Sequence, residues 1–304
     1  MHMDFLKITD LKKEQLFSIL DSAQKLKSEH KEGKINSSLA GKTLALLMEK
    51  PSTRTTASFL AAISQLGGSA IHLNSSTSQL SRGEPFSDTG AILGSYSDII
   101  AARLHKHTDL EELANATSTP VINALTDLDH PCQALAALLT MKEKGKLFAG
   151  AKFVFAGDCG FNVANALMGA CALAGLEITL ACPKECAVNK EYLKFAQSHS
   201  AVKISHNLLS AAKDADIIYT DTWVSMGQEV EKEKRMQTFL PFQVNSAVMQ
   251  AAKENAIFMH DLPAYRGKEV SADVIDGPQS TIFDEAENRL HVQKALMLHL
   301  LEKN

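Results

Sequence analysis

The chain of 304 residues lacks the features that define several protein classes. It has no Cys-x-x-Cys pair, and its five cysteines are an odd number, which excludes a disulfide framework. Its longest apolar stretch, residues 166–176, is too short to cross a bilayer and is interrupted by glycines. Its 31 basic and 35 acidic residues give a net charge of −4, which gives no support to binding nucleic acid or a membrane surface. We therefore expect a cytoplasmic protein with reduced thiols that binds neither nucleic acid nor membranes.

What is present is an ordinary globular composition, with 45% hydrophobic and 22% charged residues, in a length that suggests two domains. Short apolar runs alternate with helical patterns, which predicts parallel sheets with crossover helices. Strands are expected at 43–48, 70–73, 99–103, 121–123, 153–156, 178–181, 202–205, 216–219 and 256–260. Helices are expected at 12–30, 53–66, 86–96, 108–116, 130–143, 162–174 and 285–301. The fold class we predict is α/β, with two doubly wound domains and an active-site cleft between them.

We place the boundary between the two domains near residue 145, because the charged run Lys142–Lys146 is typical of a solvent-exposed connecting segment. This predicts a first domain at 1–145 and a second at 146–285.

Two short motifs lie where a predicted strand meets a predicted helix. In the first, hydroxyl groups at 52, 53 and 55 and the guanidinium of Arg54 surround the start of the helix. Free backbone N–H groups and the positive end of the helix dipole favour a phosphate or carboxylate there. A simple N-cap at Ser52 or Thr53 with a solvated Arg54 is the alternative. In the second motif, His130-Pro-Cys-Gln133, the imidazole can donate to a substrate carbonyl, or it can belong to a satisfied His-Pro turn.

Further segments with chemical potential lie in the second half and near the end of the chain. Residues 157–162 resemble a nucleotide-binding turn but lack the glycine spacing of a dinucleotide site. Asp221 follows a predicted strand, where a carboxylate can bind an amine. The charged run 229–235 is expected to be a solvated loop. His260-Asp-Leu-Pro263 follows the last predicted strand, and Glu287-Asn-Arg289 lies near the start of the terminal helix.

Together and in this order, four motifs resemble the aspartate/ornithine carbamoyltransferase family along nearly the whole chain. They are Ser52-Thr-Arg-Thr55, His130-Pro-Cys-Gln133, Asp221-Thr-Trp-Val-Ser-Met-Gly227 and Phe283-Asp-Glu-Ala-Glu-Asn-Arg289. The Ser-Met-Gly segment indicates the ornithine branch. The resemblance implies transfer of the carbamoyl group of carbamoyl phosphate to the δ-amine of L-ornithine, giving L-citrulline and phosphate. It implies no metal and no organic cofactor, a homotrimer or multiple of trimers, and a terminal helix, 286–304, that packs on the first domain. Whether the reaction serves arginine biosynthesis or arginine breakdown stays open.

The resemblance also implies roles for individual residues. Carbamoyl phosphate would be bound by Ser52, Thr53, Arg54, Thr55, Arg103, His130 and Gln133. Gln79 would reach into the site of a neighbouring subunit, and Leu262 and Arg289 would close the site around the carbamoyl group. The catalytic residues would be Arg54, Thr55, His130 and Arg289. Ornithine would contact Asn162, Asp221, Ser225, Met226 and Asp261.

Three positions depart from the family pattern, and one of them bears on the substrate. Asp261 replaces a cysteine that lies beside the ornithine side-chain amine, Thr56 replaces a common second arginine, and Phe161 replaces a common asparagine. Asp261 would either stand beside Asp221 and stabilise the protonated amine, or turn away and pair with Arg266 or Lys268.

Two alternative functions stay open, and the change at 261 is the feature that opens the first of them. One is a carbamoyltransferase for another amine, such as putrescine or a modified ornithine. The other is a non-catalytic carbamoyl phosphate-binding relative, against which the intact Arg54, His130 and Arg289 argue.

Overall fold

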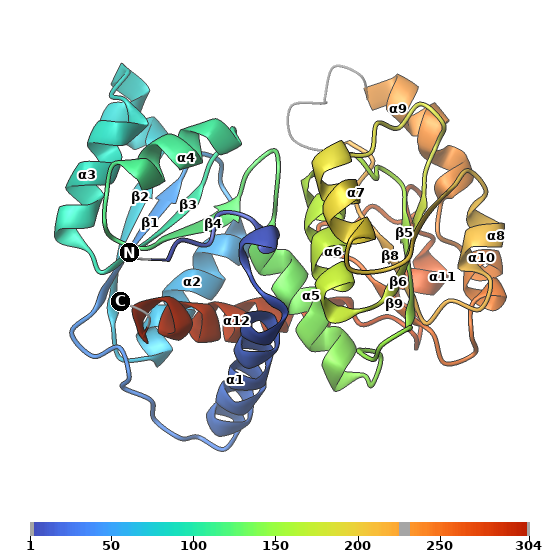
Figure 1. The fold of residues 1–304 in the computed structure, drawn as a ribbon, viewed down its shortest axis with the longest axis horizontal. Helices are drawn as coiled ribbons and strands as arrows, with labels where there is room; N and C mark the ends of the chain where they lie inside the picture. The colour runs from blue at the N-terminus through green and yellow to red at the C-terminus, as the bar shows by residue number, and fades with distance from the viewer. Residues whose placement is uncertain (1–2, 225–231, 303–304) are drawn as a thin grey trace. The chain divides into compact units, whose positions relative to one another are not determined.

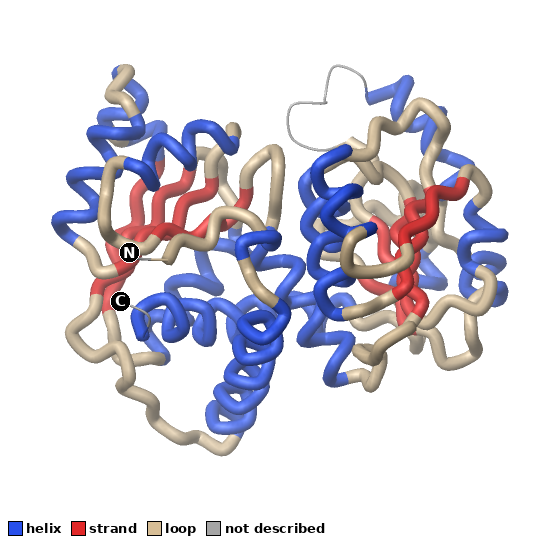
Figure 2. Tube along the Cα trace, in the orientation of Figure 1, coloured by secondary structure: helices blue, strands red, loops and turns tan. Residues whose placement is uncertain are grey.

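The computed structural model describes residues 3–224 and 232–302, and the chain divides into two compact units. Unit 1 comprises residues 1–136 and 287–304, and unit 2 comprises residues 137–286. Figure 1 shows the elements of both units, and Figure 2 shows that each unit has its strands gathered into one sheet.

Unit 1 is built on a parallel sheet in the order β2-β1-β3-β4. Its strands are β1 (Thr43–Met48), β2 (Ser69–Asn74), β3 (Ile99–Arg103) and β4 (Val121–Leu125). Every residue of β1 after Thr43 is buried, because helices cover both faces of the sheet at this central strand. On one face lie α3 (Phe86–Tyr96) and α4 (His107–Asn115), and α2 (Thr53–Gln65) lies on the other (Figure 1). The remaining elements of this unit are η1 (Ile8–Asp10), α1 (Lys13–Lys31), η2 (Ser75–Thr77), η3 (Gln79–Arg82), the start of α5 (Pro131–Glu143) and most of α12 (Ile282–Glu302).

Unit 2 is built on a second parallel sheet, in the order β7-β6-β5-β8-β9. Its strands are β5 (Lys152–Ala156), β6 (Glu177–Ala181), β7 (Val202–Ser205), β8 (Ile217–Thr220) and β9 (Ile257–Met259). One face carries α6 (Asn162–Ala174) and α7 (Lys190–Gln197), and the other carries α8 (Leu208–Ala212), α10 (Ser246–Ala251) and α11 (Ala272–Ile275), as Figure 1 shows. Two further elements, α9 (Lys232–Phe239) and η5 (Leu240–Phe242), precede α10.

The α/β fold with two parallel sheets is therefore confirmed, and every strand predicted from the sequence exists. The bounds of β1, β3 and α3 agree with the prediction residue for residue. One prediction in the charged run is wrong, because its second part, from Lys232, forms the first turn of α9 and is not a solvated loop. Residues 229–231 lie outside the described part of the chain. The functional division at residue 145 stays a prediction. Among the described helices, none is both long and apolar enough to cross a membrane.

Candidate active site

Three strands of unit 1 bring the first two motifs to one edge of the sheet. Because the strands are parallel, their carboxyl ends lie together, and this is where open α/β sheets bind ligands. Ser52 follows β1 and caps α2, Arg103 is the last residue of β3, and His130 follows β4. Thr53 and Arg54 are the first two residues of α2, so the free N–H groups of that helix face the same edge.

The start of α2 is held by a small network of hydroxyl groups. The Ser52 Oγ accepts the backbone N–H of Thr55 at 3.4 Å and donates to the Thr55 Oγ1 at 3.1 Å. Arg103 Nη1 also donates to Thr55 Oγ1, at 3.1 Å. Since this hydroxyl accepts both bonds, its own proton is left to donate to a ligand. Ser52 does cap the helix, and the Thr55 hydroxyl can still donate to a ligand. The interpretation as an N-cap and the interpretation as an anion site are therefore compatible.

A second group in unit 1 joins His130, Gln133 and Arg289, which are all almost fully buried. Arg289 Nη1 donates to Gln133 Oε1 at 2.5 Å and lies 3.4 Å from His130 Nε2. Burial, followed by the positive charges of Arg289, Arg103 and Arg54, lowers the pKa of His130 well below its usual value. The imidazole is therefore neutral at neutral pH, and with Nε2 facing a guanidinium its proton belongs on Nδ1.

These contacts define an anion site of high positive charge. Three arginines act on one neutral histidine beside a helix N-terminus, and no carboxylate is among the groups that shift the pKa of that histidine. Guanidinium groups and helix N-termini both bind phosphate oxygens.

Gln79 is the residue predicted to reach a neighbouring subunit. It begins η3, and its side chain is exposed.

In unit 2, two neighbouring strands place acidic residues together. Asp221 directly follows β8, and His260 and Asp261 follow β9, the strand that pairs with β8. One ligand atom from each of these three side chains lies within 4.8 Å of the other two. The Asp221 Oδ1 also accepts the backbone N–H of Thr222, at 2.5 Å. The same donor atoms would suit a divalent cation, whereas the sequence predicts no metal, and that stays a prediction.

The imidazole of His260 lies between carboxylates. Its Nε2 is 3.4 Å from Glu269 Oε1, and its Nδ1 is 3.3 Å from Asp261 Oδ1. Burial lowers the pKa of His260, but hydrogen bonds to Asp261 and Glu269 and the charges of Asp261 and Asp221 outweigh burial and raise it to about 10. The Leu262 amide nitrogen also lies 2.9 Å from Nδ1, so this atom accepts from Leu262 only when it carries no proton. The surrounding negative charge favours the protonated form, in which Nδ1 donates to Asp261.

Asp221 and Asp261 form a close carboxyl pair. Burial, followed by the negative charge of Asp261, raises the pKa of Asp221 well above its usual value. Arg266 donates instead to Asp276, through Nε at 2.8 Å and Nη2 at 2.5 Å. Lys268 Nζ lies 4.5 Å from the ring centroid of Tyr265. Of the two placements open from the sequence, the structure has Asp261 beside Asp221.

The remaining predicted ornithine contacts, and Leu262, which is predicted to close the site around the carbamoyl group, are only partly described. Asn162 is the first residue of α6, almost fully buried, and its Oδ1 lies 2.8 Å from the backbone nitrogen of Val163. Leu262 has φ +60°, a strained conformation for a leucine, and packs against the core of unit 2. Ser225 and Met226 lie outside the described residues.

Two features of unit 2 escaped the sequence analysis. Glu269 is a single acid within Gly267-Lys-Glu-Val270, and no pattern in the sequence singles it out. Arg235, in the charged run, forms an ion pair with Asp158. Arg235 has no local sequence signal because Asp158 lies 77 residues away in the chain. Glu269 lies near His260 in the chain, but no pattern predicts that the two side chains face each other.

Unit 1 of this α/β protein has a positively charged site suited to an anion, and unit 2 has an acidic cluster suited to an amine. These are the features of a group-transfer enzyme that acts on a phosphorylated donor and an amine. Residues 3–143 match the carbamoyl-P binding domain of aspartate/ornithine carbamoyltransferases, and residues 149–300 match the Asp/Orn binding domain. The chain belongs to the aspartate/ornithine carbamoyltransferase family.

Individual relatives support the ornithine branch. The chain is 49% identical to an ornithine carbamoyltransferase of Anoxybacillus flavithermus, with 98% of this chain and 96% of the relative covered. It is 47% identical to one of Pyrococcus abyssi, with 98% and 95% covered. Among solved structures, the ornithine carbamoyltransferase of Pyrococcus furiosus is 44% identical and superimposes with a TM-score of 0.95 over 100% of this chain and 98% of that chain. The anabolic ornithine carbamoyltransferase of Campylobacter jejuni is 40% identical, with a TM-score of 0.93 over 99% of both chains.

Proposed function

We propose that this protein transfers the carbamoyl group of carbamoyl phosphate to the δ-amine of L-ornithine and releases L-citrulline and phosphate. The observation that carries the proposal is the anion site of unit 1, where burial, followed by the positive charges of Arg289, Arg103 and Arg54, lowers the pKa of His130. A site of this charge suits the phosphate of carbamoyl phosphate. The acidic cluster of unit 2 suits the amine of the second substrate.

The chemistry needs a stabilised oxyanion more than it needs a strong base. The neutral δ-amine attacks the carbamoyl carbon, and the carbonyl oxygen becomes negative in the tetrahedral intermediate. Arg54, the free proton of the Thr55 hydroxyl and His130 are placed in this proposal to donate to that oxygen. When the intermediate collapses, the attacking nitrogen passes one proton to the leaving phosphate and the C–O bond to phosphate breaks. The departing hydrogen phosphate dianion stays bound by the arginines. Thr53 donates to the phosphate, and Ser52 donates to it when its hydroxyl proton turns from Thr55 Oγ1 to a phosphate oxygen. Gln133 holds Arg289 in place.

His130 carries a specific condition in this scheme. Its Nε2 faces Arg289, so the imidazole donates to the carbonyl through Nε2 only after Arg289 takes another partner and the proton moves from Nδ1 to Nε2. Carbamoyl phosphate offers such a partner, because its phosphate oxygens compete for the guanidinium.

The second substrate is assigned to unit 2. In this proposal Asn162 binds the amino-acid end of ornithine, and Asp221 and Asp261 lie near its amines. Ser225 and Met226 complete the set on the basis of the family motif, and Leu262 closes the site around the carbamoyl group.

The finer features of the proposal concern assembly and context. We propose a homotrimer, or a multiple of trimers, in which the exposed Gln79 contributes to the site of a neighbouring subunit. We also propose a cytoplasmic enzyme of arginine biosynthesis. Two observations support this context: all five cysteines are free, and a relative from Pyrococcus furiosus is named anabolic.

The test is a colorimetric assay for ureido products with carbamoyl phosphate and a panel of amines. We expect citrulline from L-ornithine and little product from putrescine or from modified ornithines. Preferential carbamoylation of another amine would replace ornithine as the substrate. Activity with none of the amines, together with measurable carbamoyl phosphate binding, would favour the non-catalytic relative.

A further inference from the structure

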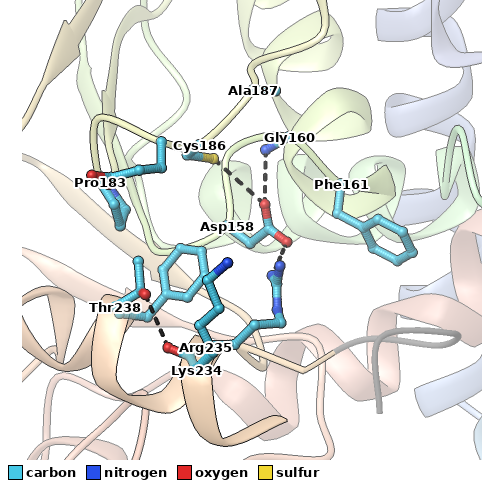
Figure 3. A pocket seen from close by; sticks show the side chains of 11 residues that line it. Asp158, Gly160, Phe161, Pro183, Cys186, Ala187, Lys234, Arg235 and Thr238 are labelled. Carbon is cyan, nitrogen blue, oxygen red and sulfur yellow. Dashed lines mark hydrogen bonds and ion pairs between the residues drawn. The ribbon is translucent and has the colours of Figure 1, made fainter. Parts of the chain in front are cut away.

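An ion pair in unit 2 joins two parts of the chain that the proposed mechanism leaves unconnected. Asp158 lies in the turn after β5, and Arg235 lies in α9. Arg235 Nη2 donates to Asp158 Oδ2, and both side chains are mostly shielded, with exposed fractions of 15% for Arg235 and 12% for Asp158. Figure 3 shows the two side chains pointing toward each other at the wall of a cavity of about 380 Å³. A pair this shielded is screened less by solvent and salt than a surface salt bridge.

The Asp158 end of the pair fixes the turn that leads into α6. Its second carboxylate oxygen, Oδ1, accepts the backbone N–H of Gly160 at 3.1 Å and the thiol of Cys186 at 3.5 Å (Figure 3). Gly160 is two residues before Asn162, the proposed contact for ornithine. The carboxylate thus holds the backbone immediately before that contact.

The Arg235 end fixes the segment that follows β8. Arg235 Nε donates to the backbone carbonyl of Trp223 at 2.7 Å, and Trp223 is two residues after Asp221. The Arg235 guanidinium also lies 4.9 Å from the centroid of the Phe239 ring. One arginine therefore binds the turn after β5 through its terminal nitrogen and the turn after β8 through Nε.

Trp223 packs against both the turn after β5 and helix α9, the two segments that the ion pair joins. It is almost fully buried, and its ring lies 6.4 Å from that of Phe239 at an interplanar angle of 23°. A Cβ atom added to Gly157 would lie 3.4 Å from the indole ring, so the ring packs against the turn after β5. The tryptophan thus reports directly on whether the two turns keep their spacing.

We propose that Asp158 and Arg235 are positioning residues that set the spacing between Asn162 and Asp221 for the amino-acid substrate. This inference rests on the proposed function, because it assumes that both residues contact ornithine. Neither Asp158 nor Arg235 has to touch the substrate. Their effect is exerted through backbone hydrogen bonds to Gly160 and Trp223.

The experiment compares Asp158→Asn and Arg235→Gln with a matched control, Arg266→Gln. The control breaks the ion pair with Asp276, which is also Arg–Asp and in unit 2 but is exposed. Asp158→Asn keeps an oxygen for the N–H of Gly160 and removes only the charge. KM for ornithine, KM for carbamoyl phosphate, kcat and the fluorescence of Trp223, the only tryptophan of the chain, are measured for each variant.

We expect both variants to raise KM for ornithine by about tenfold or more, because loss of positioning weakens every contact that depends on it. KM for carbamoyl phosphate should stay within about twofold, since its proposed site lies in unit 1. Trp223 emission should shift to longer wavelength and become more accessible to a neutral quencher. Arg266→Gln should change none of these quantities, and the double variant should be no worse than the more affected single variant.

Each outcome bears on one of the two claims. Retention of the wild-type KM for ornithine in both variants, with unchanged Trp223 emission, would overturn the positioning role. If Arg235→Gln does not fold, Arg235→Lys keeps the charge but loses the bond to the Trp223 carbonyl, and an unchanged KM for ornithine in it would count equally against the role. If the wild-type enzyme makes no citrulline, the proposed function fails and this role fails with it, while Trp223 emission still shows whether the pair orders the two turns.

Discussion

Replacement of Asp261 by cysteine should move the pH–rate profile for ornithine to lower pH and raise turnover near neutral pH. Asp261 stands where the family pattern has a cysteine, and the structure places it in a cluster with Asp221 and His260. A carboxylate beside the bound δ-amine favours its ammonium form. The nucleophile is the neutral amine. Asp261 therefore lowers the rate at every pH at which deprotonation of the δ-ammonium group limits the reaction.

The size of the shift follows from the distances in the cluster. A full negative charge at about 5 Å acts on an ammonium with about 3 kcal/mol at an effective dielectric constant near 20, which corresponds to about two pH units. Two features of the structure reduce this value. The raised pKa of Asp221 lets the carboxyl pair retain a proton, and His260, whose pKa is about 10, is cationic at neutral pH. We therefore expect a shift of about 0.5–1 pH unit.

The assay is the pH dependence of kcat and of kcat/KM for ornithine, measured over roughly pH 6 to 10. Asp261→Asn is the matched variant, because it removes the charge and keeps the size of the side chain. The same downward shift in both variants would identify charge as the cause, whereas a shift in Asp261→Cys alone would identify the thiol. Asp276→Asn, at an exposed carboxylate of the same unit, serves as the control. Unchanged profiles and unchanged ornithine affinity in both Asp261 variants would refute the reasoning.

Three further predictions test the anion site, the assembly and the core of unit 2. Arg54→Ala should lower kcat by about 100-fold and weaken carbamoyl phosphate binding with the fold intact, and near wild-type turnover would disprove its role. Mixing inactive Gln79→Ala chains with inactive Arg289→Ala chains should restore up to about a quarter of the activity, because randomly mixed trimers contain intact sites; confirmed hybrids without activity would disprove the shared site. Tyr219→Phe should lower the free energy of unfolding by about 1–3 kcal/mol, since it removes the 2.7 Å hydrogen bond that the buried hydroxyl donates to Glu285 Oε1; an unchanged denaturation midpoint would count against this.

The sequence predicts the parallel-strand framework well because the buried strands are continuous apolar runs. β1 and β3 are buried along almost their whole length, and no other element type fits runs so short between helical patterns. The short helices of unit 2 escaped prediction for the opposite reason. α8 has only five residues, and α9 begins with Lys-Glu-Lys-Arg, which shows no apolar periodicity. Helices of this length are stabilised by tertiary contacts rather than by their own sequence, and for α9 these include the bonds of Arg235.

For the candidate site, the motifs predict which residues gather but not their contacts or protonation. His130 is recognisable from its motif, yet its neutral state depends on burial and on arginines that lie 27 to 159 residues away in the chain. The sequence likewise does not determine which side chain lies beside Asp261. Arg266 and Lys268 are nearer to it in sequence than Asp221, but parallel pairing of β8 and β9 brings the ends of these two strands together. Sheet topology therefore outweighs sequence proximity at this position. It makes Asp261 a neighbour of the proposed amine site, where one substitution in the family motif can change the protonation of the substrate.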